Sequence, residues 1–262
     1  MPQFERWRGQ WALITGASAG IGAALARELA ASKTNLILTA RRQERLDALA
    51  HELRARHGIA VEVYCADLSA ADGPGALFAF TEGKAIEVAL LVNNAGFGAY
   101  GELDQVPLER LSEMVAVNVA AVVKLTGLYL PSMLGRGRGD ILIVASTAAF
   151  QPVPYMSTYA ATKAFDLMFA QGLAEEVRAR GVRVCALCPG TTQTEFAEVA
   201  GRRGSMRAGE RAEKVAQVGL EALAAGRSAV ISGLANKLGV ASQRLAPRAL
   251  VARITGALFR PH

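Results

Sequence analysis

The sequence predicts a single α/β domain in which helices cover both faces of a doubly wound parallel sheet of about seven strands. Three observations lead to this prediction. Short apolar runs alternate with longer helical patterns along the whole chain. Each run is apolar at nearly every position, which is typical of parallel strands buried on both faces. No linker rich in Pro, Gly or Ser and no repeat divides residues 1–262.

The predicted strands span residues 11–15, 35–40, 60–65, 88–93, 140–145, 183–188 and 228–232. Apolar residues at every fourth position, such as Ile21, Leu25 and Leu29, predict helices between them. Longer helices are predicted over 107–134 and 156–180. Strands joined in this way form right-handed crossovers, and such sheets bind ligands at the carboxyl ends of their strands.

Composition excludes several other classes of protein. The 262 residues are 52% hydrophobic, which is globular rather than disordered composition. A formal net charge of +6 is spread without a basic run or recognition motif, so no nucleic-acid partner is expected. The most apolar helical stretch, 115–130, is interrupted by Asn118 and Lys124, so we expect no membrane-spanning helix. Without a signal-peptide core near the N-terminus, we expect a cytoplasmic protein.

The cysteines predict neither disulfides nor a metal site. Cys65, Cys185 and Cys188 are an odd and sparse set. Cys185 and Cys188 have the C-x-x-C spacing, but residues three apart on a strand point to opposite faces and chelate poorly. We expect these cysteines to belong to the core.

A glycine-rich turn follows the first predicted strand and opens a helix, with the sequence Gly16-Ala17-Ser18-Ala19-Gly20-Ile21-Gly22. Glycines permit a tight turn, and the helix N-terminus presents free N–H groups and a positive dipole end to an anion such as a pyrophosphate. The spacing differs from both G-x-G-x-x-G and the P-loop. The alternative is a tight connection that needs glycine for steric reasons alone.

Arg41 and Arg42 follow the second predicted strand, where dinucleotide folds select their cofactor. An acidic residue there binds the ribose 2′-hydroxyl, whereas Arg accommodates a 2′-phosphate. Two cations at the start of a helix are also unfavourable unless an anion compensates them. We therefore expect NADP(H) to be preferred over NAD(H). The alternative is that both side chains extend into water near Glu44 and Asp47.

Asp67 and Leu68 come directly after the third predicted strand. The carboxylate of Asp67 is a candidate acceptor for the adenine amino group. The alternative is that Asp67 caps a helix beginning near Ser69.

Tyr159 and Lys163 are four residues apart in the predicted helix 156–180, so their side chains share one face. An isolated phenol has a pKa of about 10, and a nearby ammonium, like a cationic nicotinamide, favours the phenolate. We therefore expect the pKa of Tyr159 to be lowered, so that it exchanges a proton with a carbonyl or alcohol oxygen. Ser146 follows a strand at the same edge and can hold that oxygen. The alternatives are a surface pair and a turn serine without function.

With these residues in place, the chain resembles the short-chain dehydrogenase/reductase family over nearly its whole length. Residues 15–22 look like the T-G-x-x-x-G-x-G motif, and 93–96 match N-N-A-G. The Ser-to-Tyr spacing of 13 residues is the one usual in the family. Two further elements are similar: the catalytic tetrad Asn118, Ser146, Tyr159 and Lys163, and Pro189-Gly190 followed by Thr191 and Thr194.

The resemblance implies a role for each residue of the tetrad. Tyr159 is the general acid in reduction and the general base in oxidation. Lys163 lowers the Tyr159 pKa and binds the nicotinamide ribose, Ser146 orients the substrate carbonyl, and Asn118 holds a water in a proton relay. The expected cofactor-binding residues are Gly16, Ser18, Ala19, Gly20, Ile21, Gly22, Arg41, Arg42, Asp67, Leu68, Asn94, Ala95, Gly96, Tyr159, Lys163, Pro189, Gly190, Thr191 and Thr194.

Two aromatic loops, 96–100 and 150–155, are expected to build an apolar substrate pocket, although their rings could merely pack the loops. By resemblance, 191–209 is a substrate lid. Its arginines, Arg202, Arg203 and Arg207, are candidates for an anionic substrate or carrier phosphate, or for a solvated face.

The segment 247–260 predicts a basic amphipathic helix. Leu250, Ile254 and Leu258 form an apolar stripe with Val251 beside it, flanked by arginines. Such a helix can lie on an anionic membrane, dock on another subunit or cover the substrate mouth. The resemblance of such tails to those of family members acting on acyl or lipid-like ketones favours an apolar substrate.

The leading hypothesis is an NADP(H)-dependent oxidoreductase that reduces a carbonyl or oxidises the matching secondary alcohol. The alternative is a cofactor-binding regulatory or scaffold protein that has lost turnover, which the intact tetrad disfavours. The resemblance also implies a homodimer or homotetramer formed through the two long helices.

Overall fold

A computed structural model describes residues 4–201, 209–243 and 245–261. Its seven parallel strands form one sheet in the order β3-β2-β1-β4-β5-β6-β7, which confirms the predicted doubly wound fold. Every predicted strand is present, with ends that differ by one residue at most. The strands are β1 (Trp11–Thr15), β2 (Asn35–Ala40), β3 (Val61–Cys65), β4 (Val88–Asn93), β5 (Gly139–Val144), β6 (Val182–Cys188) and β7 (Ala229–Ile231).

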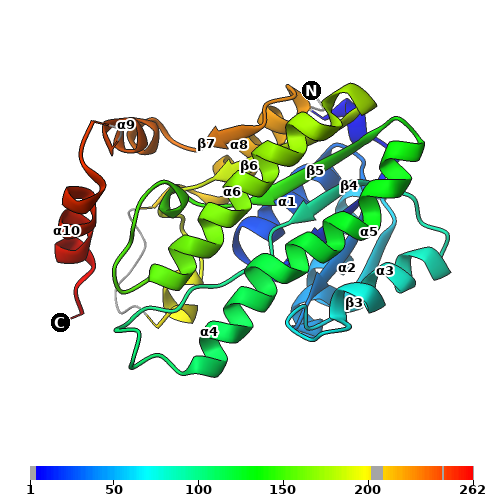
Figure 1. Ribbon diagram of the computed structural model, residues 1–262. Coiled ribbons are helices and arrows are strands. Elements are labelled where there is room, and N and C mark those ends of the chain that lie inside the picture. The colour runs from blue at the N-terminus through cyan, green and yellow to red at the C-terminus, as the bar shows by residue number, and fades with distance from the viewer. Residues whose placement is uncertain (1–3, 202–208, 244, 262) are drawn as a thin grey trace.

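Helices cover both faces of this sheet (Figure 1). Neighbouring residues of a strand point to opposite faces, so the sheet has a hydrophobic core on each face: Leu13 of β1 packs into one core and Ile14 into the other. Ile14 faces the helices α1 (Gly20–Ala31), α2 (Gln43–His57) and α8 (Ala212–Ala224). Leu13 faces α3 (Gly73–Gly83), α5 (Ala121–Gly135) and α6 (Ser157–Val177). Shorter helices connect these layers: η1 (Glu5–Trp7), η3 (Thr147–Phe150), η4 (Arg178–Arg180) and α7 (Phe196–Val199).

The helix predicted over 107–134 is continuous but not uniform. It begins as α4 (Leu108–Val115), passes through the π-helical turn η2 (Ala116–Ala120), and continues as α5. The helix Leu108–Gly135 is, by length and composition only, long and apolar enough to cross a membrane, because its most apolar 18-residue window has a mean hydropathy of 1.6. This differs from our expectation that no stretch would qualify. In this structure 44% of the most apolar window is buried, and α5 packs against the sheet through residues such as Leu125.

At the amino edge of the sheet, Asp140 of β5 fixes the N-terminal segment. Its Oδ2 accepts hydrogen bonds of 2.7 Å from both Arg6 Nε and Trp7 Nε1, and its Oδ1 accepts one of 2.7 Å from Arg183 Nε. Trp7 is fully buried with Phe4 beneath the sheet. A buried carboxylate is stable only with such compensation, so this network ties η1 to β5 and β6.

The chain ends in α9 (Leu234–Gln243) and α10 (Arg248–Phe259), beside the carboxyl edge of the sheet (Figure 1). The predicted apolar stripe of α10 faces outward: Leu250, Ile254 and Leu258 are 47%, 52% and 70% exposed. The adjoining face, with Val251 and Thr255, is buried against the protein. The Thr255 hydroxyl donates to the Pro152 carbonyl over 3.0 Å.

Candidate active site

A pocket of about 460 Å³ opens over the carboxyl ends of β1, β2, β4, β5 and β6. Every residue of the predicted catalytic tetrad and of the predicted cofactor-binding set lines this pocket, except Gly22 and Asn118. The predicted residues that line it are Gly16, Ser18, Ala19, Gly20, Ile21, Arg41, Arg42, Asp67, Leu68, Asn94, Ala95, Gly96, Ser146, Tyr159, Lys163, Pro189, Gly190, Thr191 and Thr194.

The glycine turn is built for close approach. Gly16 has a φ of +66°, and a Cβ there would lie 2.8 Å from Asn94 Nδ2. A Cβ on Gly22 would collide with the Gly16 carbonyl, so Gly22 lets α1 pack against the turn. Ala19 precedes α1 without a capping side chain, and the first turn carries no acid. The free N–H groups of α1 therefore face the pocket, as a pyrophosphate requires.

Asn94 and Thr15 join the ends of β4 and β1 beside this turn. The Thr15 hydroxyl accepts hydrogen bonds of 2.9 Å from the backbone N–H groups of Asn94 and Ala95. Asn94 Nδ2 donates to the Thr15 carbonyl over 2.8 Å. These bonds hold the floor of the pocket in the shape that the glycine turn needs.

Arg41 and Arg42 lie at the pocket rim, and both are paired. Arg41 Nη1 is 2.6 Å from Glu113 Oε1, and Arg42 Nη1 is 2.8 Å from Glu195 Oε2. Arg42 also donates from Nη2 and Nε to the Ser18 hydroxyl, over 3.1 and 3.2 Å. A hydroxyl and a guanidinium side by side suit a phosphate ester, although Glu195 shares the guanidinium.

Asp67 lines the pocket and also closes a local turn. Its Oδ1 accepts hydrogen bonds from the Ser69 backbone N–H over 2.9 Å and from the Ser69 hydroxyl over 2.6 Å. The Ser69 hydroxyl bond holds the pKa of Asp67 below its usual value. The helix itself begins later, at Gly73, so Asp67 does not cap a helix near Ser69 as the alternative suggested.

Tyr159, Lys163 and Ser146 all line this pocket, and both Lys163 and Ser146 interact with the Tyr159 hydroxyl. Lys163 is 5% exposed, and its Nζ donates to the Val144 carbonyl over 2.8 Å and to Asp166 Oδ2 over 2.9 Å. A Cβ on Gly96 would lie 3.4 Å from Lys163 Nζ, so glycine leaves room for the ammonium. Ser146 accepts a hydrogen bond from the Ala148 N–H, which sets its rotamer.

The pKa of Tyr159 moves opposite to the direction that the sequence predicts. Burial raises it most, while the Lys163 ammonium and a hydrogen bond with Ser146 lower it. The Phe196 ring, with its centroid 5.1 Å from that of Tyr159, contributes to this burial. In the protein alone desolvation outweighs the ammonium, so the phenol is protonated at neutral pH.

Asn118 lies beneath the pocket in the π-helical turn η2 and is fully buried. Its Nδ2 donates to the Phe97 carbonyl and the Thr162 hydroxyl, both over 3.0 Å, and its Oδ1 accepts from the Phe97 N–H over 3.1 Å. The side chain thus ties the loop of Phe97 to α6. The predicted water-holding role stays a prediction.

Two polar residues of α6 that support the site, Thr162 and Asp166, are not among the predicted site residues. Thr162 receives a hydrogen bond from Asn118, and Asp166 pairs with Lys163 Nζ. Spacing carried a signal for Asp166, because a carboxylate three residues after a lysine shares its helix face.

Apolar side chains close the substrate side of the pocket. Phe97 and Val153, from the two predicted loops, line it, as do Phe196 of α7 and Phe259 of α10. The Tyr100 hydroxyl donates to the Phe259 carbonyl over 2.9 Å, which holds α10 over the mouth. Of the three alternatives for the tail, this arrangement fits the one in which it covers the substrate mouth. Of the predicted lid, 191–201 and 209 are described, whereas Arg202, Arg203 and Arg207 lie outside the described residues.

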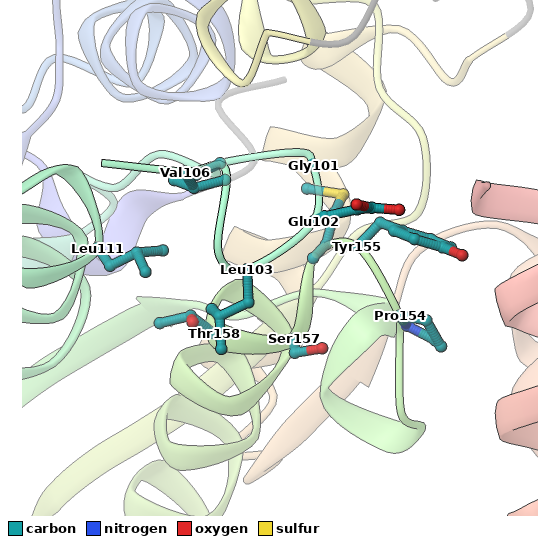
Figure 2. A pocket seen from close by; sticks show the side chains of 11 residues that line it. Gly101, Glu102, Leu103, Val106, Leu111, Pro154, Tyr155, Ser157 and Thr158 are labelled. Carbon is teal, nitrogen blue, oxygen red and sulfur yellow. The ribbon is translucent and has the colours of Figure 1, made fainter. Parts of the chain in front are cut away.

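A second pocket of about 230 Å³ lies beyond this wall (Figure 2). Leu103 lies beside Ser157 and Thr158 at the start of α6 there, and Val106 also lines the pocket. Tyr155, predicted to serve the substrate pocket, lines this second pocket instead, with a strained φ of +65°. The loop 150–155 therefore divides its side chains between two pockets.

Among the described residues, no group of three or more His, Cys, Asp or Glu could hold a metal ion. Cys185 and Cys188 are buried as expected, and burial raises the pKa of each thiol to about 12. Both thiols therefore stay neutral in the core. Cys65, at the end of β3, is exposed, so the expectation that it belongs to the core is wrong.

Comparison with known proteins assigns the family. The family model described as short chain dehydrogenase matches residues 10–203. The chain belongs to this family. It is 33% identical to a short-chain dehydrogenase from Sphingobium yanoikuyae in complex with NADPH, with a TM-score of 0.81 over 90% of this chain and 94% of that one. It is 28% identical to a 7β-hydroxysteroid dehydrogenase, with a TM-score of 0.87 over 97% and 99%.

Curated relatives include very-long-chain 3-oxoacyl-CoA reductases. The duck protein (Anas platyrhynchos) is 36% identical over 196 residues, and the human protein (Homo sapiens) is 33% identical over 195 residues. Each alignment covers 73% of this short-chain dehydrogenase and 62% of the relative. The chain thus spans less than two thirds of the length of these relatives.

Proposed function

We propose that this short-chain dehydrogenase reduces the carbonyl group of an apolar, acyl-like substrate with NADPH. The observation that carries the proposal is the convergence of Tyr159, Lys163 and Ser146 in one pocket with a phosphate-binding glycine turn. The relatives point the same way, since several are named as reductases of 3-oxoacyl-CoA and one solved neighbour holds NADPH.

The raised pKa of Tyr159 suits the reductive direction. A buried, protonated phenol is a proton donor at neutral pH, and the Ser146 hydroxyl beside it can hold the carbonyl oxygen that receives the proton. Bound NADPH would supply the hydride. The Lys163 ammonium stabilises the phenolate left behind, because opposite charges favour each other most strongly in a buried site.

NADP(H) is proposed as the preferred cofactor on the strength of Ser18 and Arg42. The turn between β1 and α1 fits a pyrophosphate, and its glycines leave the space that a Cβ would fill. At the end of β2, Ala40 is followed by two arginines and no acid that would bind the 2′-hydroxyl of NAD.

The substrate is proposed to be apolar because the wall opposite the cofactor turn is built from Phe97, Val153, Phe196, Val199 and Phe259. Burial of methylene groups there favours longer acyl chains by about 0.8 kcal/mol for each group. Ketones of increasing chain length should therefore show increasing kcat/KM until the pocket is filled.

Turnover with NADPH and a panel of such ketones tests the function, together with the variant Tyr159→Phe. We expect the variant to bind NADPH like the wild type and to lose kcat by about a hundredfold or more. If the wild type binds NADPH but reduces no ketone of the panel, the alternative of a regulatory or scaffold protein is favoured. If Tyr159→Phe turns over at the wild-type rate, the assigned role is refuted.

A homo-oligomer in the cytoplasm is also proposed, with α5 and α6 as the subunit interface. Their outward faces expose Val123, Phe165 and Met168, which are 40%, 37% and 60% exposed, and a second copy could cover them. Light scattering of the wild type and of Met168→Asp tests this, since a charge at the interface should dissociate the oligomer.

A further inference from the structure

Asp166 is a buried carboxylate one helical turn beyond Lys163 on α6, and the family motifs give it no role. It is fully buried, and its Oδ2 lies 2.9 Å from Lys163 Nζ. The ammonium has three N–H donors. One goes to Asp166 and one to the Val144 carbonyl at 2.8 Å. One donor therefore remains on the side of the pocket that Lys163 lines.

The charge of Lys163 needs a counterion. Burial lowers its pKa most, and the Asp166 carboxylate followed by Tyr159 raises it, with a net rise. Among the described residues, the titratable groups around Lys163 are Tyr159 and Asp166 from α6 and Cys188 from β6. Tyr159 and Cys188 are neutral at neutral pH, because burial raises the pKa of both. Asp166 is thus the group that can balance the ammonium.

Stability alone does not account for this carboxylate. Burial raises the pKa of Asp166, and the Lys163 ammonium opposes the rise, so each charge depends on the other. Asp166 Oδ1 is buried and has no hydrogen-bond partner among the described residues. A buried ion pair with an unsatisfied oxygen stabilises a fold less than an apolar pair of similar volume would.

We propose that Asp166 is a positioning residue that fixes the Lys163 ammonium between α6 and the end of β5, so that its remaining N–H donor meets the cofactor. Asp166 touches neither substrate nor cofactor and acts through Lys163. The inference rests on the proposed function, because it assigns Lys163 to NADPH binding and to the phenolate of Tyr159.

The test is Asp166→Asn, which keeps the shape and one acceptor but removes the charge. NADPH binding is titrated from pH 6 to 10, and kcat/KM for ketone reduction is measured over the same range. We expect NADPH affinity to fall by about tenfold at neutral pH, and to fall further as pH rises, because the unpaired ammonium loses its proton earlier. Glu176→Gln, an exposed carboxylate on the same helix, is the matched control and should leave both profiles unchanged.

A double-mutant cycle separates positioning from a structural role. If Asp166 acts through Lys163, Asp166→Asn should change NADPH affinity by less than about twofold in a Lys163→Met background. Asp166→Glu, which restores a carboxylate, should recover part of the affinity. If Asp166→Asn does not fold, as judged by thermal unfolding, Asp166→Ser replaces it in the cycle.

The outcomes distinguish the two proposals. If the wild type binds NADPH and reduces ketones, and Asp166→Asn matches it in affinity and in both pH profiles, the role of Asp166 is refuted. The same holds if Asp166→Asn weakens binding equally with and without Lys163. If the wild type neither binds NADPH nor reduces a ketone, the proposed function itself fails.

Discussion

Replacement of Arg42 by Ala should weaken the binding of NADPH and leave the binding of NADH nearly unchanged. The Arg42 guanidinium lies against the Ser18 hydroxyl at the pocket rim, with Nη2 3.1 Å from Oγ. A 2′-phosphate in this position would accept a charge-assisted bond of about 1.5–3 kcal/mol. Because the Arg42 side chain is 44% exposed, solvent screening reduces this to about 1–2 kcal/mol. The NADPH dissociation constant should therefore rise by about 5- to 30-fold.

The assay is a fluorescence titration of both cofactors against the wild type and the variant. Arg45→Ala is the matched control, since Arg45 Nη1 pairs with the same Glu195 carboxylate at 2.6 Å but does not line the pocket. An equal loss for NADPH and NADH would refute the assignment, because NADH has no 2′-phosphate to lose. A wild type that prefers NADH by about tenfold or more would overturn the roles of both Arg41 and Arg42.

Burial raises the pKa of Tyr159, and reduction needs the protonated phenol. The rate of ketone reduction should therefore stay flat between pH 6 and 9 and fall only in more alkaline buffer. A fall in the stopped-flow rate between pH 6 and 8 would contradict the argument that burial keeps the phenol protonated. Glu195→Gln should tighten NADPH binding a few-fold in the same fluorescence titration, because it removes a carboxylate that competes with phosphate for Arg42. Asp140→Ala should lower the free energy of unfolding by about 2–4 kcal/mol in urea titrations, because it leaves the three N–H donors of Arg6, Trp7 and Arg183 unpaired. A loss below about 0.5 kcal/mol would refute the role of Asp140 in tying η1 to the sheet. Phe259→Ala should raise the KM for long-chain ketones by about 5- to 30-fold and leave the KM for acetone-sized ketones unchanged, since about 1–2 kcal/mol of apolar contact is lost. An equal rise in KM for long and short ketones would argue against contact between Phe259 and the acyl chain of the substrate.

The sheet was predictable because each strand is apolar on both faces and is separated from the next by a helix. Periodicity did not reveal the π-helical turn at Ala116–Ala120, because residues 115–123 are apolar at every position except Asn118 and so show no helical phase that an extra residue could shift. That turn carries Asn118, whose side chain joins the Phe97 loop to α6. Asn118 was predicted as a site residue from its position in the sequence, but its place beneath the pocket was not predicted.

The motifs placed most of the predicted residues at the pocket, although Gly22 and Asn118 are not part of its lining. They misjudged the direction of the Tyr159 pKa, which depends on burial beside Phe196, from a segment 37 residues further along the chain. The apolar stripe of α10 left open what that helix contacts. In the structure the helix packs through Val251 and Thr255 and leaves Leu258 exposed. In both cases long-range packing decided a property that local spacing cannot encode.

The two ends of the chain lie in different surroundings, and this affects how the protein can be handled. The first described residues pack under the amino edge of the sheet, whereas α10 ends beside the opening through which a ketone would enter (Figure 1). A fusion partner or affinity tag joined beyond residue 262 follows α10 and is expected to alter the apparent chain-length preference, because Phe259 of α10 lines that opening. Comparisons among ketones are therefore best made without an addition at that end.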